Sequence, residues 1–207
     1  VPGVSLTKKD RNTDYVFLGY SSPKTPSRVY LYNLSTKSKK LVKEQEIPSG
    51  HNPDDFIVER IEFKSHDGRL VPLTITRHKK TKIDGSANLL LYGYGSYGNS
   101  MSPNFSSTRL SLINRDIIWA TAHIRGGMEK GMKWWKEGKL TNKKNTFEDY
   151  IHAAKYLIDN KYSSKGKLIG MGGSAGGLLM GAVVNQAPEL FLGIIMAVPF
   201  VDSLTTN

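Results

Sequence analysis

Residues 167–177 read Lys167-Leu168-Ile169-Gly170-Met171-Gly172-Gly173-Ser174-Ala175-Gly176-Gly177, and this stretch decides the fold. A short apolar run comes before the glycines and a helix-like run, residues 177–184, follows them, so Ser174 stands at a strand-to-helix corner. A serine among glycines at such a corner is typical of a nucleophile elbow, which holds the hydroxyl where a base and a substrate carbonyl can reach it. The pattern predicts that Ser174 is a catalytic nucleophile.

The residues around the serine have roles of their own in this interpretation. A turn this sharp brings the strand and helix backbones together, so we expect no room for Cβ atoms at the elbow glycines, Gly172, Gly173, Gly176 and Gly177. The helix that begins at Ala175 adds backbone N–H groups and a positive dipole end beside the place where an oxyanion would form. We therefore expect Ala175 to supply half of an oxyanion hole.

A dinucleotide-binding turn is the alternative for the same glycines, because residues 170–175 fit the pattern G-x-G-x-x-G/A. That pattern needs an acidic residue at the end of the next strand, which here covers residues 193–198 and has none. Asp202 is the only candidate, and it comes late. A Walker loop is excluded because no Lys-Ser or Lys-Thr follows the glycines. The serine nucleophile is favoured.

The rest of a catalytic triad is missing. In hydrolases with this elbow, an acid and then a histidine follow the serine. After Ser174 the only acids are Glu189 and Asp202, and Asp202 stands very close behind the elbow. All five histidines precede the serine: His51, His66, His78, His123 and His152. We interpret the chain as a piece of a longer hydrolase, inactive alone, whose triad Asp and His lie beyond residue 207.

Composition argues against several classes of function. The net charge of +11 and the pI near 9.7 raise the question of a nucleic-acid partner. However, basic runs such as residues 37–40 and 78–82 fall in expected loops, and no helix carries a basic stripe.

No apolar run reaches the roughly 18 residues of a membrane span. Without cysteine or His-Glu-x-x-His spacing, a metal site is not expected. We expect no nucleic acid, membrane, metal or cofactor, and a cytoplasmic location.

The N-terminal part differs in pattern from the rest. Aromatic and β-branched residues alternate with polar ones, as in an antiparallel meander, over residues 15–20, 29–34 and 40–42. We interpret residues 1–47 as the end of a β-propeller domain, a partial blade. Residues 48–58 are expected to be a linker, and residues 59–207 the N-terminal part of an α/β-hydrolase catalytic domain.

Strands dominate the first part of the expected catalytic domain. Residues 56–64 and 70–76 predict a hairpin around Asp67-Gly68. Residues 89–92 and 117–120 are short apolar runs that predict buried strands.

Helices alternate with these strands. Apolar residues at helical spacing predict a helix over residues 146–160, with Thr146 and Asp149 as an approximate capping box. Short apolar strands between helices are typical of a mostly parallel sheet covered on both faces, with the elbow at the carboxyl end of a central strand. The expected fold class is α/β, of an incomplete α/β-hydrolase type, preceded by antiparallel strands.

Four motifs together resemble one family: Tyr92-Gly-Tyr-Gly-Ser-Tyr-Gly98, His123-Ile-Arg-Gly-Gly127, residues 138–147, and residues 171–181 around the elbow. They are similar to the prolyl oligopeptidase family of serine peptidases, family S9, and within it to the oligopeptidase B branch, also called protease II. Ala175 after the serine and residues 198–202 favour that branch. The resemblance runs from about residue 48 to residue 207, and the preceding meander resembles the end of the family's propeller.

The resemblance implies a serine endopeptidase that cleaves short peptides after Arg or Lys. It implies that Ser174 is the nucleophile and that the Tyr94 hydroxyl joins the Ala175 N–H in the oxyanion hole. The implied partners are short peptide substrates, together with the missing propeller and the C-terminal catalytic segment of the same protein. The alternatives are an esterase or prolyl peptidase of the same fold, and a non-catalytic α/β remnant or complementing fragment.

One segment departs from the family pattern. Where oligopeptidase B commonly reads Ser-Ile-Asp-x-Asp-Phe-Ser, this chain reads Ser-Met-Ser-Pro-Asn-Phe-Ser over residues 100–106. In the family, the two acids help to hold a second basic side chain next to the cleavage site. Ser102 and Asn104, which replace them, can accept hydrogen bonds but bring no charge. We expect this possible substrate subsite to give little preference for dibasic peptides.

Overall fold

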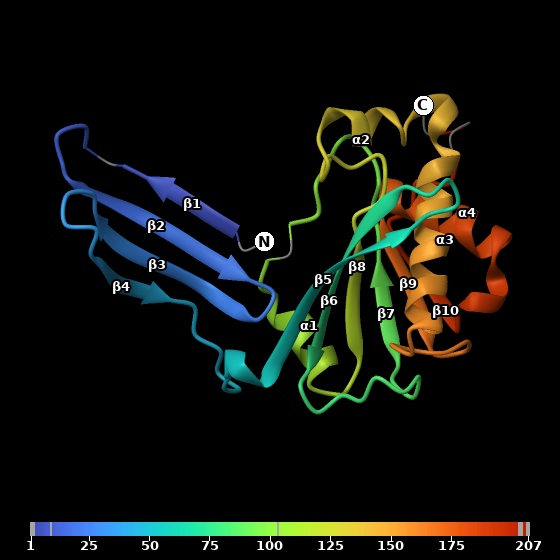
Figure 1. The fold of residues 1–207 in the computed structure, drawn as a ribbon, viewed down its shortest axis with the longest axis horizontal. Coiled ribbons are helices and arrows are strands. Elements are labelled where there is room, and N and C mark those ends of the chain that lie inside the picture. Colours follow the sequence, from blue (N-terminus) through green and yellow to red (C-terminus); the bar gives the residue numbers. More distant parts are fainter. Residues whose placement is uncertain (1–2, 9, 103, 203–204, 206–207) are drawn as a thin grey trace.

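The computed structural model describes residues 3–8, 10–102, 104–202 and 205; the outermost residues of the two expected domains, 1–2 and 206–207, lie outside this part, as do 203–204. The described chain forms two separate β-sheets (Figure 1). The N-terminal sheet stands beside a larger α/β unit. Residues 45–55 connect them and include the short 3₁₀ turn η1 (Pro53–Asp55).

The N-terminal sheet is a four-stranded antiparallel meander. Its strands follow each other in chain order: β1 (Gly3–Thr7), β2 (Tyr15–Ser22), β3 (Thr25–Asn33) and β4 (Lys39–Glu44). The three strands expected between residues 15 and 42 are confirmed. Strand β1 is not predicted by its sequence, because its five residues pair with β2 through the backbone while Val4 and Leu6 stay exposed.

The larger sheet has six strands in the order β10-β9-β7-β8-β6-β5. Its four parallel strands are β10 (Gly193–Ala197), β9 (Leu168–Gly173), β7 (Leu89–Tyr92) and β8 (Ile118–Ala122). A hairpin of β5 (Phe56–Lys64) and β6 (Leu70–His78) adds an antiparallel edge. The predicted hairpin, buried strands and mostly parallel sheet are confirmed. Because β9 has a neighbour on each side, the elbow stands within the sheet and not at its edge.

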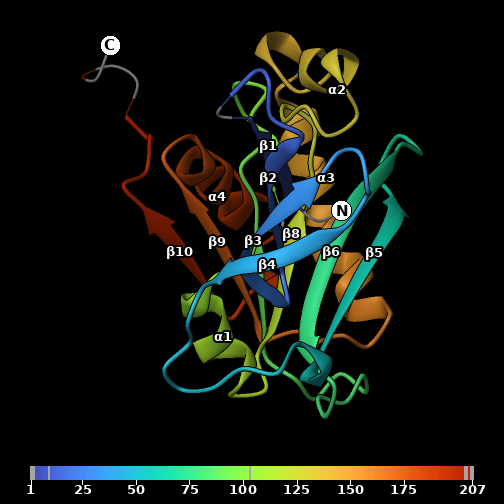
Figure 2. The ribbon, with the colours of Figure 1, turned by 90° about the vertical axis from the view of Figure 1, so that its left-hand side faces the viewer.

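Helices cover both faces of the larger sheet, as predicted. Helices α3 (Lys144–Asp159) and α4 (Ala175–Gln186) lie on one face, where they enclose the main hydrophobic core (Figure 1). Helix α1 (Ser107–Ile113) lies on the other face, where a smaller apolar cluster forms around Phe56. This second face is the one toward the meander, which lies in front of the α/β unit in Figure 2.

Three shorter elements lie in the connections: α2 (Met132–Lys136), η2 (Leu140–Asn142) and η3 (Pro188–Leu190). None of the helices in the described ranges is long and apolar enough to cross a lipid bilayer.

The predicted capping box is wrong, although the predicted helix is confirmed as α3. The helix begins at Lys144, so Thr146 and Asp149 lie within it. The Thr146 hydroxyl donates to the carbonyl oxygens of Arg125 (2.9 Å) and Gly138 (3.1 Å), and Asp149 is fully buried against the Arg125 side chain. Both side chains join α3 to neighbouring loops. Tertiary contacts therefore explain a spacing that resembles a helix start.

Candidate active site

Ser174 occupies the corner between β9 and α4 in a backbone conformation that few residues adopt. Its φ is 55° and its ψ is −119°, and its side chain is exposed. A non-glycine residue in such a region is strained by about 1–3 kcal/mol, so the surroundings must hold it there. The Ser174 N–H donates to the carbonyl of Ala197 at 2.9 Å, and its own carbonyl accepts from the N–H groups of Gly177 (2.8 Å) and Phe200 (3.0 Å). The predicted strand-to-helix corner is confirmed.

Three of the elbow glycines are required by close backbone contacts. A Cβ on Gly172 would lie 2.2 Å from the carbonyl oxygen of Gly176, and one on Gly176 would lie 2.9 Å from that of Gly93. A Cβ on Gly177 would lie 2.4 Å from Pro199. Strand, helix and the turn after β7 therefore meet here at distances that only glycine permits.

The same expectation is wrong for Gly173, the residue next to the serine. A Cβ there would have its nearest neighbour, the carbonyl oxygen of Ala197, at 3.4 Å, which is ordinary contact. Gly173 lies at the end of β9, where the Cβ direction points beside β10 and not into α4.

This contrast predicts different effects of two alanine substitutions. We expect Gly172→Ala to lower the free energy of unfolding by about 1–3 kcal/mol, because the new methyl group overpacks the corner. Gly173→Ala serves as the matched control and should change the free energy of unfolding by less than about 0.5 kcal/mol. Urea unfolding of both variants measures the difference, and equal effects would contradict the steric account.

Ala175 is the first residue of α4, so its N–H lies at the end of the helix where backbone donors lack intrahelical partners. The positive end of the helix dipole points in the same direction. An oxyanion that forms at the exposed Ser174 hydroxyl would lie beside this helix end.

Tyr94 follows strand β7 and lies beside the first turn of α4. A Cβ on Gly176 would stand 3.4 Å from Cδ2 of the Tyr94 ring. The N–H of Gly93 donates to the carbonyl of Met171 at 3.0 Å, which joins this turn to strand β9. The structure thus brings Tyr94 and the elbow, 80 residues apart in the chain, to one corner. The oxyanion role of the Tyr94 hydroxyl remains a prediction.

The histidines make contacts elsewhere. His123 is 1% exposed, and its Nε2 lies 2.8 Å from Thr74 Oγ1; burial lowers the pKa of His123. His51 Nε2 lies 2.7 Å from the carbonyl oxygen of Lys24. In the described part of the chain, no hydrogen bond of a histidine reaches Ser174. The described residues also form no group of three or more His, Asp or Glu side chains that could hold a metal ion. The absence of a metal or cofactor from the protein remains a prediction.

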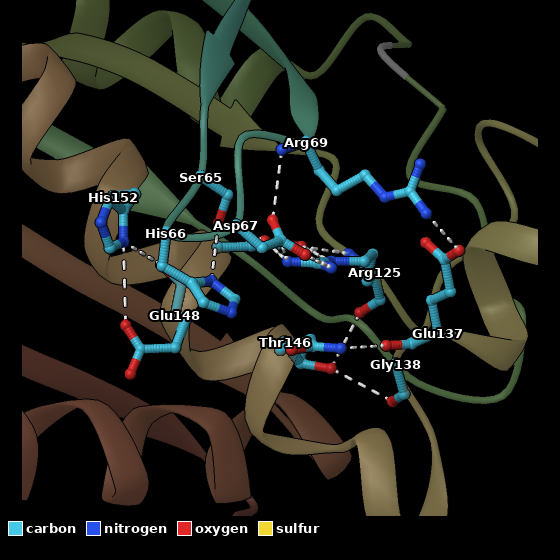
Figure 3. A network of polar contacts seen from close by, with 12 residues as sticks. Ser65, His66, Asp67, Arg69, Arg125, Glu137, Gly138, Thr146, Glu148 and His152 are labelled. Carbon is cyan, nitrogen blue, oxygen red and sulfur yellow. Dashed lines mark hydrogen bonds and ion pairs between the residues drawn. The ribbon is translucent and has the colours of Figure 1, made fainter.

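A network of polar contacts around Arg125 joins the turn between β5 and β6 to helix α3 (Figure 3). Arg125 and Asp149 are 1% and 0% exposed, and the Arg125 guanidinium donates to Asp149 at 2.6 and 2.9 Å. It also donates to Asp67 Oδ2 at 2.6 Å, while the Ser65 hydroxyl donates to Asp149 at 2.6 Å. Burial lowers the pKa of Arg125, but the hydrogen bonds that it donates to the carboxylates of Asp149 and Asp67 outweigh this effect and raise the pKa above its ordinary value. Arg125 therefore stays charged and joins the turn between β5 and β6 to helix α3.

A hollow of about 360 Å³ opens beside the elbow. Ala175 and Leu178 of α4 form part of its wall, and aromatic and apolar side chains form much of the rest, namely Tyr97, Trp135, Leu140 and Phe200. Its charged lining residues are Lys139 and Lys143, and no Asp or Glu among the described residues lines it. The hollow is therefore mostly apolar with a cationic side.

The comparisons with known proteins agree with this geometry. A sequence model described as the prolyl oligopeptidase family matches residues 103–207. The chain belongs to the prolyl oligopeptidase family. The resemblance expected from the four motifs is thus confirmed.

Relatives within the prolyl oligopeptidase family are similar over nearly the whole chain. Dipeptidyl aminopeptidase BI of Pseudoxanthomonas mexicana is 45% identical over 198 residues, which are 95% of this chain and 27% of the relative. Protease 2 of Moraxella lacunata is 42% identical over 201 residues, 97% of this chain and 29% of the relative. The structure of oligopeptidase B from Leishmania major matches with a TM-score of 0.89 and 38% identity, over 98% of this chain and 29% of that one. The chain therefore spans less than a third of the length of these relatives.

Ser102 and Asn104 of this prolyl oligopeptidase family member lie toward the meander. Both are exposed. A Cβ on Gly3 of β1 would stand 2.7 Å from Asn104 Oδ1, and the N–H of Phe105 donates to the Ser21 hydroxyl at 3.2 Å. The segment thus contacts the meander just before α1, and among the described residues no hydrogen bond joins it to the elbow. Its role as a subsite remains a prediction.

Two side chains near the corner are not identified by the sequence patterns. The fully buried Tyr150 hydroxyl donates to the carbonyl of Leu91 at 2.5 Å and accepts from the N–H of Met171 at 3.3 Å, so it joins β7 to β9. Burial raises the pKa of Tyr150, which therefore stays protonated. Lys143 is the second such side chain. Tyr150 lies within helix α3 and Lys143 directly before it, and the sequence pattern predicts only that a helix forms there.

Proposed function

We propose that this chain supplies the nucleophile and the oxyanion hole of a serine peptidase that cleaves short peptides after Arg or Lys. The observation that carries the proposal is the exposed Ser174, held at φ 55° at the start of α4. A structural serine gains nothing from such strain, whereas a nucleophile gains an accessible hydroxyl next to backbone donors.

In this mechanism the Ser174 Oγ attacks the carbonyl carbon of the scissile peptide bond while a histidine takes its proton. The carbonyl oxygen becomes an oxyanion, which accepts hydrogen bonds from the Ala175 N–H and the Tyr94 hydroxyl. The histidine then gives its proton to the leaving amine. Water next attacks the acyl carbonyl while the histidine takes a proton from it, and the histidine returns that proton to the Ser174 oxygen as the acid product leaves. The triad acid and base come from outside the 207 residues.

Preference for a basic side chain would also depend on residues outside this chain. The hollow beside Ala175 presents Lys139 and Lys143 but no carboxylate from the described residues. Apolar walls suit the stem of an Arg or Lys side chain, whose charged end would need acids supplied from elsewhere. Cytoplasmic location is part of the same proposal and remains a prediction.

The test is the selectivity of the complete peptidase. We expect kcat/KM for a chromogenic peptide with Arg at the cleavage site to exceed that for the matching Pro peptide and for a simple ester. Ser174→Ala is the control that must abolish all three. A higher kcat/KM for the Pro peptide would favour a prolyl peptidase instead.

The segment with Ser102 and Asn104 gives a separate prediction about dibasic peptides. We expect the unmodified peptidase to hydrolyse Arg-Arg and Ala-Arg peptides with similar kcat/KM, because neither residue is charged. The double substitution Ser102→Asp with Asn104→Asp should create a preference of about five- to tenfold, since each partly exposed ion pair contributes on the order of 1 kcal/mol.

Salt is the control for this prediction. The created preference should weaken between low and high ionic strength, because exposed charges are screened. A strong, salt-sensitive dibasic preference in the unmodified peptidase would show that other acids bind the second basic side chain.

A further inference from the structure

Lys143 reaches from the approach to α3 into the turn that carries Tyr94. Its Nζ donates to the carbonyl oxygen of Gly95 at 2.6 Å and to the Ser96 hydroxyl at 2.8 Å. Both partners follow Tyr94 directly in the chain. One side chain thus holds two successive residues of this turn.

The two ends of the turn are held differently. At its start, the Gly93 N–H donates to strand β9, and at its end the Gly98 N–H donates to the carbonyl of Gly126 at 2.9 Å. Between them, the Gly95 carbonyl is enclosed, since a Cβ on Gly126 would lie 2.0 Å from its oxygen. Among the described residues, the hydrogen bond to that carbonyl comes from Lys143. Lys143 therefore supplies the side-chain hydrogen bonds to the middle of the turn.

The position of Lys143 is costly for a charged group. Burial lowers the pKa of Lys143 to about 8, and no ion pair joins it to a carboxylate in the described part of the chain. Lys139 shows the contrast, because its Nζ lies over the Trp135 ring, 3.6 Å from the ring centre. A half-buried lysine that has no carboxylate partner among the described residues and makes two hydrogen bonds to one turn points to a specific role there.

We propose that Lys143 is a positioning residue that sets the Tyr94 hydroxyl for oxyanion binding by fixing the Gly95–Ser96 backbone behind it. The inference rests on the proposed function, in which Tyr94 is an oxyanion donor. Lys143 acts through the turn and does not touch the substrate carbonyl in this account.

The test compares Lys143→Met with the matched control Lys144→Met in the complete peptidase. Loss of the two hydrogen bonds should lower kcat about ten- to hundredfold, because an oxyanion donor loses its alignment. KM should change by less than about twofold, since the hydroxyl binds charge that exists only in the transition state. Lys144→Met, at the exposed neighbouring lysine, should leave kcat within about twofold.

A double-mutant cycle with Tyr94→Phe separates positioning from general damage. In the Tyr94→Phe background, Lys143→Met should change kcat by less than about twofold, because the hydroxyl it positions is gone. Equal effects of Lys143→Met with and without the hydroxyl would overturn the inference. Lys143→Gln, which keeps a polar but shorter side chain, goes through the same cycle and decides the matter if the methionine variant does not fold.

The outcomes also separate this inference from the proposed function. If Tyr94→Phe lowers kcat and Lys143→Met does not, the inference alone is overturned and the oxyanion role of Tyr94 stands. If the peptidase with both residues intact hydrolyses no peptide, the proposed function fails first.

Discussion

Residues 1–207, produced alone, should hydrolyse Arg-containing peptides about 10⁴ to 10⁶ times more slowly than the complete peptidase proposed above, because we expect the triad histidine to lie outside these residues. All five histidines precede Ser174, and none of their hydrogen bonds reaches it within the described residues. Without a base, the serine hydroxyl is a weak nucleophile at neutral pH. Turnover of a chromogenic Arg peptide by the two proteins, at equal concentration, measures the ratio.

Ser174→Ala in residues 1–207 is the control for contaminating peptidases. Any turnover that survives this substitution does not come from the elbow. Turnover that the substitution abolishes would mean that a base within residues 1–207 activates Ser174, and the interpretation of the missing triad would be wrong.

Tyr94→Phe in the complete peptidase should lower kcat by about 10² to 10³ while KM stays nearly unchanged. The tyrosine ring would stay beside the first turn of α4, where it lies against Gly176, so only the hydroxyl is removed. That hydroxyl is expected to donate to a charge that forms only in the transition state. Steady-state kinetics with one peptide substrate measures both constants. An unchanged kcat would assign Tyr94 to packing.

The sequence predicts most of the catalytic fold because local signals and tertiary structure agree there. The corner at Ser174 combines an apolar strand, glycines and a helix start, and the structure needs all three. The hairpin of β5 and β6 follows from alternation on both sides of an Asp-Gly turn. Strand β1 is not predicted in this way, because its side chains are largely exposed. Its extended conformation depends on backbone pairing with β2.

Sequence patterns do not predict the contacts between segments that are distant in the chain. Thr146 and Asp149 have the spacing of a capping box, yet they bind loops that a pattern within one helix cannot reveal. Lys143 appears in the sequence as one of two adjacent lysines, although its Nζ reaches a turn 47 residues earlier. Gly173 shows the opposite error. It belongs to the elbow motif, yet the structure has room for a Cβ at this position. Each case depends on which segments the fold brings together.

The central claim is that Ser174 is an activated nucleophile in the complete peptidase, and covalent labelling tests it most directly. An organophosphonate ester reacts with a serine that a base activates next to an oxyanion hole, and it leaves ordinary serines unmodified. We expect one label per chain, located by mass spectrometry on the peptide that contains Ser174, together with complete loss of activity. A label on a different serine, or loss of activity without a label on Ser174, would contradict the account.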